Sequence, residues 1–439
     1  MNKKGLIISF GVLVMIAFCS CALISNGQNL VYEKTFGSPY SEFRSNAIAV
    51  DNDGNIYITG RYEITMAYFK QVNGDYKYAD TTMPSDTRLF VYKISNDGKL
   101  LQRKFLYALE GKDICITKDG NIAITGFVSR YRKENYSGDL TQGVYTALLN
   151  PNLDVIWQQI DSSKYNSVPQ KIKETSDGNL IVIAHSLINK IEMSTYLTED
   201  NTHDRFISIN KSGKIIKDTT YEMVDIDYRK DDFLQVKPLY NPKARVLAPA
   251  NLLYDVIETD KSFLFCGVCM GNTEGVSTGE GFFLMETDKN FNLKKTKSYH
   301  FNRDTEKYKD QNWGYNIALD EDKILLVGIA QYSHNRNMVI CLDKNYDTLY
   351  TRHFDGYIFG QPKVIPLSNG DYFTCNRTDS NRIAINKMND KGIIKKLELN
   401  THHILDFTGG MCLKDNCLYI TAVAKDSGIA ATYLAKIKL

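Results

Sequence analysis

The chain has 439 residues, of which 43% are hydrophobic and 24% charged, and its formal net charge is +2. This composition excludes intrinsic disorder, because disordered chains carry fewer aromatic residues and a larger net charge. The balance of 53 basic and 51 acidic residues also argues against a general nucleic-acid binder, which needs a basic surface. Length alone predicts about three domains of ordinary size. One count is unusual: there are 28 tyrosines but only 2 tryptophans.

The first 27 residues are typical of an export signal. Lys3 and Lys4 precede an apolar run over residues 5–23, and small residues that permit cleavage follow at 25–27. A retained membrane anchor is one alternative, since the run approaches the ~20 residues needed to span a bilayer. Lipidation at Cys21, which follows the small Ser20, is another. The sequence predicts an extracytoplasmic protein: an outer-membrane lipoprotein, a periplasmic protein or a secreted one.

The cysteines outside the signal region are scattered singly, which is unlike the disulfide framework of a short, loop-rich secreted domain. Most are expected to be small buried hydrophobic residues. Cys412 and Cys417 are the exception, because they bracket a tight polar turn and are candidates to face each other across a hairpin. Cys412 and Cys417 are therefore the candidate pair for a disulfide.

An internal repeat decides the fold. A short β-like run, a tight polar turn and a second apolar run that ends in a small residue recur seven times. The copies are residues 47–60, 113–126, 171–184, 254–267, 315–328, 363–376 and 410–422. Four of the turns contain Asp-Gly or Asn-Gly, which are strong hairpin signals. The closing residue is Gly or Ala in six copies and Asn376 in the other, which indicates crowding against a neighbouring backbone.

Each of the first six hairpins is followed by a second one, so that these copies contribute four strands each. Four-stranded repeats of this kind are typical of β-propeller blades. The last copy ends at Leu439 after its third strand, whereas residues 29–36 form a strand that belongs to no complete copy. We predict an all-β protein over residues 28–439: one seven-bladed β-propeller of four-stranded antiparallel blades. Residues 29–36 are expected to pair with residues 432–439 and to close the ring.

One segment resembles a known family. Residues 37–60, GSPYSEFRSNAIAVDNDGNIYITG, preceded by YEKTF, are similar to the bacterial SBBP seven-bladed β-propeller repeat. The later copies retain less of this pattern. The resemblance implies the architecture, and it implies no catalytic residue, because the repeat carries none.

The distribution of long connections points to one face of the disc. In a four-stranded blade, the first-to-second and third-to-fourth turns share one face, and the other connections share the opposite face. All the long segments fall in the second class: residues 61–87, 127–142, 185–203, 221–251 and 268–280, the last of which includes a flexible Gly-rich loop. Long loops on a rigid scaffold are where binding residues concentrate. This long-loop face is therefore the predicted binding face.

The candidate binding residues on this face are mainly tyrosines and arginines, both favoured at interfaces. They are Tyr62, Tyr68, Tyr76, Arg130, Tyr131, Arg132, Tyr228, Arg229, Tyr240 and Trp313. The same rings would also serve simply to pack the long loops onto the disc. The predicted partner is a protein or a glycan at the cell envelope, with no nucleic acid and no membrane contact beyond a lipid anchor.

Chemical motifs are few. The sequence DNDGN at residues 51–55 is explained by a hairpin turn, since an EF-hand would need Gly and Glu at two positions occupied here by Ile56 and Tyr62. No metal site, cofactor or nucleotide-binding motif is predicted. Asp113 and Asp255 near the channel mouth leave a glycan-active enzyme as the alternative, because glycosidases use paired carboxylates. The leading prediction is a non-catalytic interaction scaffold.

Overall fold

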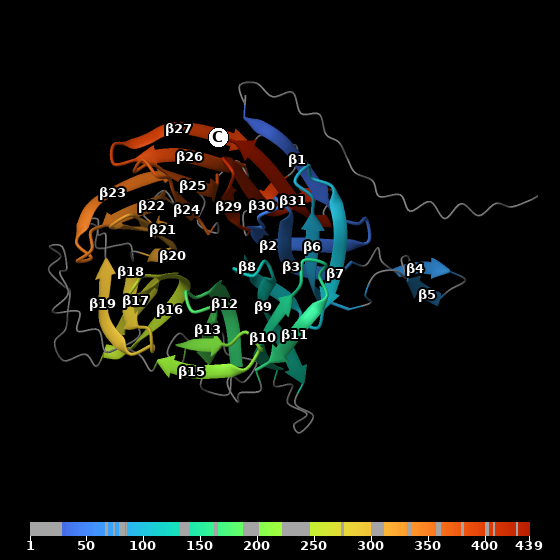
Figure 1. Ribbon diagram of the computed structural model, residues 1–439, viewed down its shortest axis with the longest axis horizontal. Coiled ribbons are helices and arrows are strands. Elements are labelled where there is room, and N and C mark those ends of the chain that lie inside the picture. The colour runs from blue at the N-terminus through green and yellow to red at the C-terminus, as the bar shows by residue number, and fades with distance from the viewer. Residues whose placement is uncertain are drawn as a thin grey trace, which may run out of the picture.

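The protein is an all-β ring of seven sheets (Figure 1). The computed structural model describes residues 29–65, 69–72, 75–78, 84, 86–131, 140–161, 166–187, 202–221, 246–273, 276–299, 311–331, 336–356, 361–378, 382–399, 404–406, 409–426 and 429–439. Within these ranges no segment is helical, and so none is a helix long and apolar enough to cross a membrane. The predicted seven-bladed propeller is confirmed. The predicted signal peptide, with Cys21, lies outside the described residues.

Each of blades 1 to 6 is an antiparallel sheet whose strands follow chain order from the channel outward. Blade 1 contains β2 (Ser41–Val50), β3 (Ile56–Ile64), β6 (Arg88–Ile94) and β7 (Leu100–Leu106). Blade 2 contains β8 (Glu110–Ile116), β9 (Ile122–Tyr131), β10 (Leu140–Leu149) and β11 (Val155–Ile160). Blade 3 contains β12 (Asn166–Glu174), β13 (Leu180–Leu187), β14 (Thr202–Ile209) and β15 (Ile215–Tyr221). Blade 4 contains β16 (Val246–Glu258), β17 (Ser262–Thr273), β18 (Val276–Asp288) and β19 (Leu293–Tyr299). Blade 5 contains β20 (Gln311–Asp320), β21 (Lys323–Gln331), β22 (Arg336–Leu342) and β23 (Thr348–Asp355). Blade 6 contains β24 (Lys363–Pro366), β25 (Tyr372–Arg377), β26 (Ile383–Asn389) and β27 (Gly392–Leu399).

Blade 7 joins the two ends of the chain. Its inner position is shared by β28 (Ile404–Asp406) and β29 (Met411–Lys414), which both pair with β30 (Cys417–Asp426), and β30 pairs with β31 (Ile429–Lys438). The outer strand is β1 (Leu30–Phe36), whose register on β31 runs from Leu30 opposite Ile437 to Phe36 opposite Thr432. The predicted closure of the ring by the N-terminal strand is confirmed.

The hairpin turns show why Asp and Gly recur in them. In the first, the Asp51 carboxylate Oδ1 accepts the N–H groups of Asp53 at 3.0 Å and Asn55 at 2.8 Å. Gly54 follows with a φ of +80°, a conformation that costs glycine little. The equivalent glycines, Gly120, Gly178 and Gly370, have φ values of +80°, +82° and +79°. The Asp51 side chain thus closes a turn, as predicted.

The repeated small residue faces a β-bulge in the inner strand. Bulges interrupt β2, β8, β12, β16 and β20, each opposite the repeated small residue within the second strand. A Cβ atom at Gly60, Gly126, Gly267 or Gly328 would lie 1.9, 2.3, 2.0 or 1.8 Å from a carbonyl oxygen of that inner strand. Such a contact is impossible without a backbone shift, which explains why the sequence keeps this position small.

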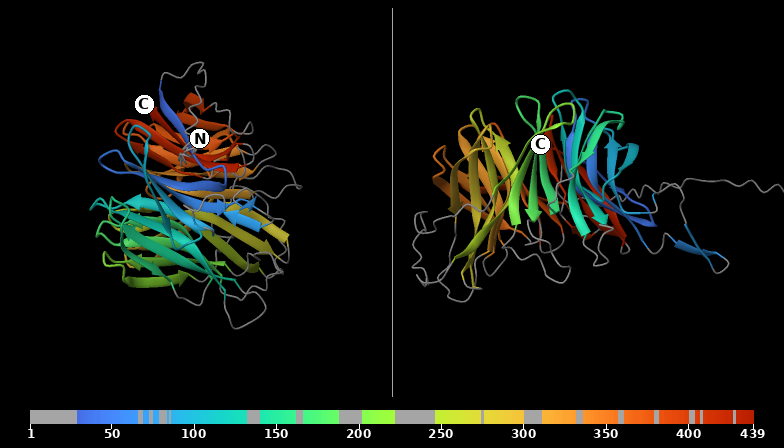
Figure 2. Two further views of the ribbon diagram at one scale, coloured as in Figure 1. Left: turned by 90° about the vertical axis from the view of Figure 1, so that its right-hand side faces the viewer. Right: turned by 90° about the horizontal axis from the view of Figure 1, so that it is seen from below.

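The two faces of the disc differ as the sequence predicts. Tight turns lie on one face, whereas the hairpin of β4 (Phe69–Val72) and β5 (Asp75–Tyr78) lies on the other, below the disc in the right view of Figure 2. One expectation is wrong: the Gly-rich segment within residues 268–280 is not a flexible loop. β17 and β18 stay paired up to Thr273 opposite Val276, so this segment is an extension of blade 4.

The candidate disulfide is not formed. Cys412 lies opposite Tyr419 and Cys417 opposite Lys414, so the two cysteines are diagonal neighbours on β29 and β30. Diagonal residues are separated by more than the ~3.8 Å between Cβ atoms that a disulfide needs. Both are free thiols packed against a core cluster between blades 7 and 1. Cys266, Cys341 and Cys375 are buried and free, as expected of small hydrophobic residues.

Candidate binding site at the channel mouth

Tyr62 is a core residue, which corrects its place among the binding candidates. Its ring is fully buried and lies 5.2 Å from the ring of Phe43 and 5.0 Å from that of Phe105, measured between centroids. Its hydroxyl donates a hydrogen bond to the carbonyl oxygen of Pro84 at 2.8 Å. Tyr62 therefore packs the start of a long connection onto blade 1 and presents no free surface to a partner.

The other candidates divide into three groups. Tyr68, Arg132, Tyr228, Arg229 and Tyr240 lie outside the described residues. Tyr76 lies on β5, and Arg130 and Tyr131 lie at the end of β9, at the long-loop face. Their role in binding stays a prediction. Trp313 lies on the inner strand β20, and it is half-buried at the heart of the site described next.

Four rings from three consecutive blades meet near the mouth of the channel. This aromatic cluster consists of His185 on β13, Tyr254 on β16, and Trp313 and Tyr315 on β20. Ring centroids lie 5.3 Å apart for His185 and Tyr254, 4.9 Å for Tyr254 and Tyr315, and 6.0 Å for Trp313 and Tyr315. Trp313 lies near the start of β20, the end that a long connection reaches, so the cluster lies toward the long-loop face.

The bulges place two of these rings. Tyr254 is the extra residue between Leu253 and Asp255 on β16, and Tyr315 is the extra residue between Gly314 and Asn316 on β20. A bulge re-aims its side chain away from the regular alternation of a strand. Because successive blades carry Tyr at the same bulge position, their rings are brought together. Tyr315 is 6% exposed, and Tyr254 is half-buried.

His185 and Asp204 support the cluster by holding the backbone of the next blade. Nε2 of His185 donates to the carbonyl oxygen of Leu253 at 2.8 Å, and the N–H of Leu253 donates to Oδ1 of Asp204 at 3.0 Å. Burial lowers the pKa of His185 to about 4, so its ring is neutral near pH 7. Burial raises the pKa of Asp204 to about 8, although the N–H of Leu253 opposes this shift. Blade 3 thus fixes the strand that carries Tyr254.

Below the cluster, one residue from each blade forms a ring around the channel. Each member is the inner-strand residue that pairs with the second strand one position before the repeated closing residue. Where the inner strand has a bulge, this member is the first residue after it. The channel ring consists of Ala47, Asp113, Lys171, Asp255, Asn316, Lys363 and Gly410. Charge alternates along part of it, from Asp113 through Lys171 to Asp255.

Three members of the channel ring bind the next blade in the same way. Each accepts the N–H of the residue that follows the ring position in that blade. The pairs are Asp113 with Ile172 at 3.0 Å, Asp255 with Ile317 at 3.2 Å, and Asn316 with Val364 at 2.8 Å. Both carboxylates therefore have a structural role, because a buried N–H group without a partner is costly.

Lys171 bridges the two carboxylates. Its Nζ lies 3.4 Å from Oδ2 of Asp113 and 3.6 Å from Oδ1 of Asp255, so the carboxylates are separated by no more than the sum of these distances. Burial disfavours the charged form of Lys171, but the two carboxylates outweigh it and raise its pKa. Burial likewise raises the pKa of Asp113, against the opposing effect of Lys171. The cluster is compact and largely screened from solvent, with side-chain exposures of 27% for Lys171, 10% for Asp113 and 6% for Asp255.

Sequence reasoning found Asp113, Asp255 and Trp313 but missed the aromatic cluster. The available signal was the first residue of two repeat copies, Tyr254 and Tyr315, which share one position in consecutive blades. His185 had no such signal, since it reaches the cluster through a neighbouring blade. Among the described residues, no group of three or more His, Cys, Asp or Glu side chains is suited to hold a metal ion.

Seven four-stranded blades around a polar channel define the chain as a seven-bladed β-propeller. Residues 36–61, which span β2 and most of β3, match the SBBP family model, described as a beta-propeller repeat, and this confirms the resemblance seen in the sequence. A search of the curated proteins found no match.

Solved structures show the same architecture at low identity. The polysaccharide lyase Uly1 is 10% identical with a TM-score of 0.53, covering 96% of this chain and 94% of that chain. The Pan2 WD40 domain of Neurospora crassa is 9% identical with a TM-score of 0.50, covering 94% and 97%. A Dyadobacter fermentans protein of unknown function is 12% identical with a TM-score of 0.44, covering 93% and 98%. At identities this low, the first two structures show a shared fold alone, and the third, with its lower TM-score, carries no argument.

Proposed function

We propose that this propeller is a non-catalytic, extracytoplasmic binding protein that engages a protein or glycan partner through its long-loop face. The observation that carries the proposal is the aromatic cluster, where two half-buried rings, Tyr254 and Trp313, lie at the channel mouth on that face. Aromatic rings offer a rigid apolar surface together with a polar edge, which suits recognition of a partner with both characters. A sugar ring has such a mixed surface, so a glycan fits the cluster best.

The contacts of the carboxylates favour binding over the alternative of a glycan-active enzyme. A catalytic pair needs one carboxyl group that meets the substrate as an acid and another that acts as base or nucleophile. Asp113 and Asp255 instead share Lys171 and each accepts a backbone N–H of the next blade. Catalysis would require these inter-blade contacts to be given up. An Asp113→Asn variant that keeps all glycan binding and loses turnover of a glycan would support the enzyme instead.

The two tryptophans allow a direct test of ligand binding. Trp157 lies on the outer strand β11, where its Nε1 donates to the carbonyl oxygen of Lys211 at 3.0 Å, far from the channel in the blade order. A Trp157→Phe variant leaves Trp313 as the sole tryptophan, so its fluorescence reports on the cluster. We expect a saturable change in this emission with a member of a panel of envelope glycans or with an extracted envelope partner.

Substitutions then locate the site. Trp313→Ala and Tyr254→Ala are expected to reduce affinity by at least about tenfold, as loss of a buried aromatic anchor does. Trp157→Ala is the matched control and should bind like the wild type. Equal binding by all three variants would remove the aromatic cluster from the proposal. Deletion of residues 69–78 tests separately whether the β4–β5 hairpin contributes.

Export is part of the proposal and has its own measurement. The basic and apolar order of residues 1–27 supports it, with Cys21 as the candidate lipid attachment site. Mass spectrometry of the mature N-terminus is expected to show either cleavage near residue 27 or a diacylated Cys21. A retained Met1 in an envelope-free fraction would contradict export.

A further inference from the structure

The channel holds more positive than negative charge. Lys171 and Lys363 belong to the channel ring, and Lys173 lies two residues along β12 with its Nζ 3.4 Å from the carbonyl oxygen of Val256. Against these three ammonium groups stand two carboxylates, Asp113 and Asp255. The next carboxylate outward, Glu258, is already paired with Lys289. One positive charge is therefore left without a partner in a largely buried setting, which is costly unless something neutralises it.

Lys173, outside the channel ring, contacts the carbonyl oxygen of Val256. Of the two lysines in the channel ring, Lys363 is the one that lacks a counter-ion among the described residues. Within the described residues it makes no ion pair, whereas Lys171 contacts two carboxylates. The charges of Lys171, Asp255 and Asp113 all act on Lys363, and burial together with Lys171 lowers its pKa. Its register position, opposite Cys375, places Lys363 in the same ring of inner-strand residues as these side chains.

Small residues occupy the channel-ring positions on one side of Lys363. In the two blades that follow, the channel-ring positions are Gly410 and Ala47, which carry no side chain or a single methyl group. On the other side of Lys363, the side-chain amide of Asn316 donates a hydrogen bond to Asp255 and accepts one from the N–H of Val364. The Lys171 side chain is 27% exposed, so solvent reaches it.

From this arrangement we infer that the channel binds an anionic group, a carboxylate or a phosphate, between the ammonium groups of Lys171 and Lys363. An anion there neutralises the excess charge and separates two like charges. Lys171 offers three N–H donors, and its two carboxylate contacts leave one for the anion. Charge-assisted hydrogen bonds of this kind are the strong ones in a low-dielectric interior.

The anion site lies one residue below the aromatic cluster on two strands, since Tyr254 and Tyr315 directly precede Asp255 and Asn316. An acidic sugar could therefore contact both, but the inference does not depend on the proposed function. Free phosphate would satisfy the ammonium groups equally well, and the experiment separates the two sources.

Calorimetric titration of the full-length protein at constant ionic strength tests the site with two probes, inorganic phosphate and glucuronate. We expect one-to-one saturable binding of at least one probe over a sodium chloride background, and a parallel rise in the melting temperature. Glucose is the neutral control for glucuronate. Tighter binding of glucuronate than of phosphate would identify an acidic sugar, and the reverse order would identify a phosphate.

Substitution of Lys363 provides the decisive comparison. Lys363→Met or Lys363→Gln should weaken binding at least about tenfold, because a charge-assisted contact is lost. Lys395→Met is the matched control, since Lys395 lies exposed on the outer strand β27 of the same blade. Undiminished binding by a folded Lys363 variant overturns the inference. If neither variant folds, the wild-type titration decides, and absence of a saturable isotherm for both probes overturns it.

Discussion

Asp204 shows how a single buried carboxyl group couples the stability of the propeller to pH. The pKa of this group rises from 3.8 to about 8 because of burial, with the N–H of Leu253 opposing the shift. Between these two values the folded state holds a proton that the unfolded chain has released. Stability therefore falls as pH rises through this window. The hydrogen bond to Leu253 persists because either a carboxyl or a carboxylate oxygen can accept it.

An Asp204→Asn variant removes this proton linkage and keeps an acceptor for Leu253. We expect it to exceed the wild type in unfolding free energy by at least ~1 kcal/mol above pH 8, which corresponds to about one unit of pKa shift. The difference should shrink toward pH 4. Urea unfolding at pH 5 and pH 9 measures it, with Asp260→Asn in an exposed turn as the control. The same pH slope in wild type and Asp204→Asn would refute the coupling.

At the scale of the element, the recurring feature is an inner strand with a bulge, paired with the small residue of the second strand that lies opposite the bulge. At Gly328 an added Cβ would lie 1.8 Å from the carbonyl oxygen of Trp313 and 2.5 Å from Cε1 of Phe282. Gly328→Ala must therefore displace the backbone of β20, at a cost of about 1–3 kcal/mol. The displaced strand carries Trp313 and Tyr315. The variant should therefore be less stable, and it should also bind more weakly the ligand that changes Trp313 fluorescence. Thermal unfolding and Trp313 fluorescence measure both effects.

The control for this prediction is Ala184→Gly, at the equivalent position of blade 3, where the chain accepts a methyl group. Its cost should be that of an ordinary strand glycine, about 0.5–1 kcal/mol, with the cluster undisturbed. A Gly328→Ala variant as stable as the wild type would mean that the bulge adjusts without strain.

The same element shows which features of the structure could be predicted from the sequence. Hairpin turns, the small residue and the closing strand are local or repeated signals, so they were predictable from residues such as Gly54 and Gly60. The bulge is not local, because it depends on how two strands pair, and it decides where Tyr254 and Asp255 point. The disulfide failed for the same reason: register placed Cys412 opposite Tyr419 and not opposite Cys417. Tyr62 was misjudged because its burial depends on Phe105, an outer-strand residue of the same blade.

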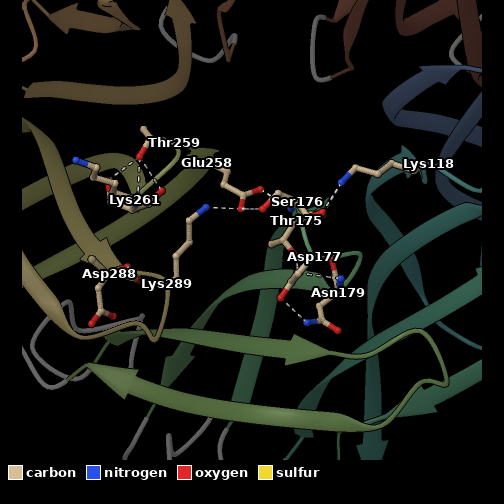
Figure 3. A network of polar contacts seen from close by, with 12 residues as sticks. Lys118, Thr175, Ser176, Asp177, Asn179, Glu258, Thr259, Lys261, Asp288 and Lys289 are labelled. Atoms are coloured by element: carbon tan, nitrogen blue, oxygen red, sulfur yellow. Dashed lines mark hydrogen bonds and ion pairs between the residues drawn. The ribbon is translucent and has the colours of Figure 1, made fainter.

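At the scale of the whole molecule, contacts between blades differ on the two faces. On the tight-turn face, Lys118 of blade 2 donates to the carbonyl oxygen of Ser176 in blade 3 at 2.7 Å, and Ser176 donates through its hydroxyl to Glu258 of blade 4 at 2.7 Å (Figure 3). Burial would raise the pKa of Glu258, but Lys289 and Ser176 outweigh it and lower the pKa. The turns thus tie blades together, while the connections on the long-loop face differ in length from blade to blade.

Acid should weaken the network of hydrogen bonds and ion pairs around Glu258. Because the pKa of Glu258 is lowered by its partners, its contribution to stability is present above the ordinary carboxyl range and is lost as pH falls through the lowered value. Glu258→Gln keeps part of the hydrogen bonding to Ser176 but loses the ion pair with Lys289. We expect this variant to be less stable near pH 7 and to differ little from the wild type near pH 3. A constant difference across that range, measured by urea unfolding, would contradict this.

Closure of the ring is the property on which the whole molecule depends, and β1 supplies it. Removing residues 29–36 leaves β31 with an unpaired row of backbone groups. It also removes Tyr32 and Phe36, and so uncovers the core cluster between blades 7 and 1 against which they pack. We expect a large fall in melting temperature together with concentration-dependent association, because an open strand edge recruits another strand. Deletion of residues 69–78 is the matched control, since β4 and β5 pair only with each other among the described strands. A synthetic peptide of residues 29–36 should restore the melting temperature in trans, by binding the folded state. An unchanged melting temperature after the first deletion would show that blade 7 is stable with three strands.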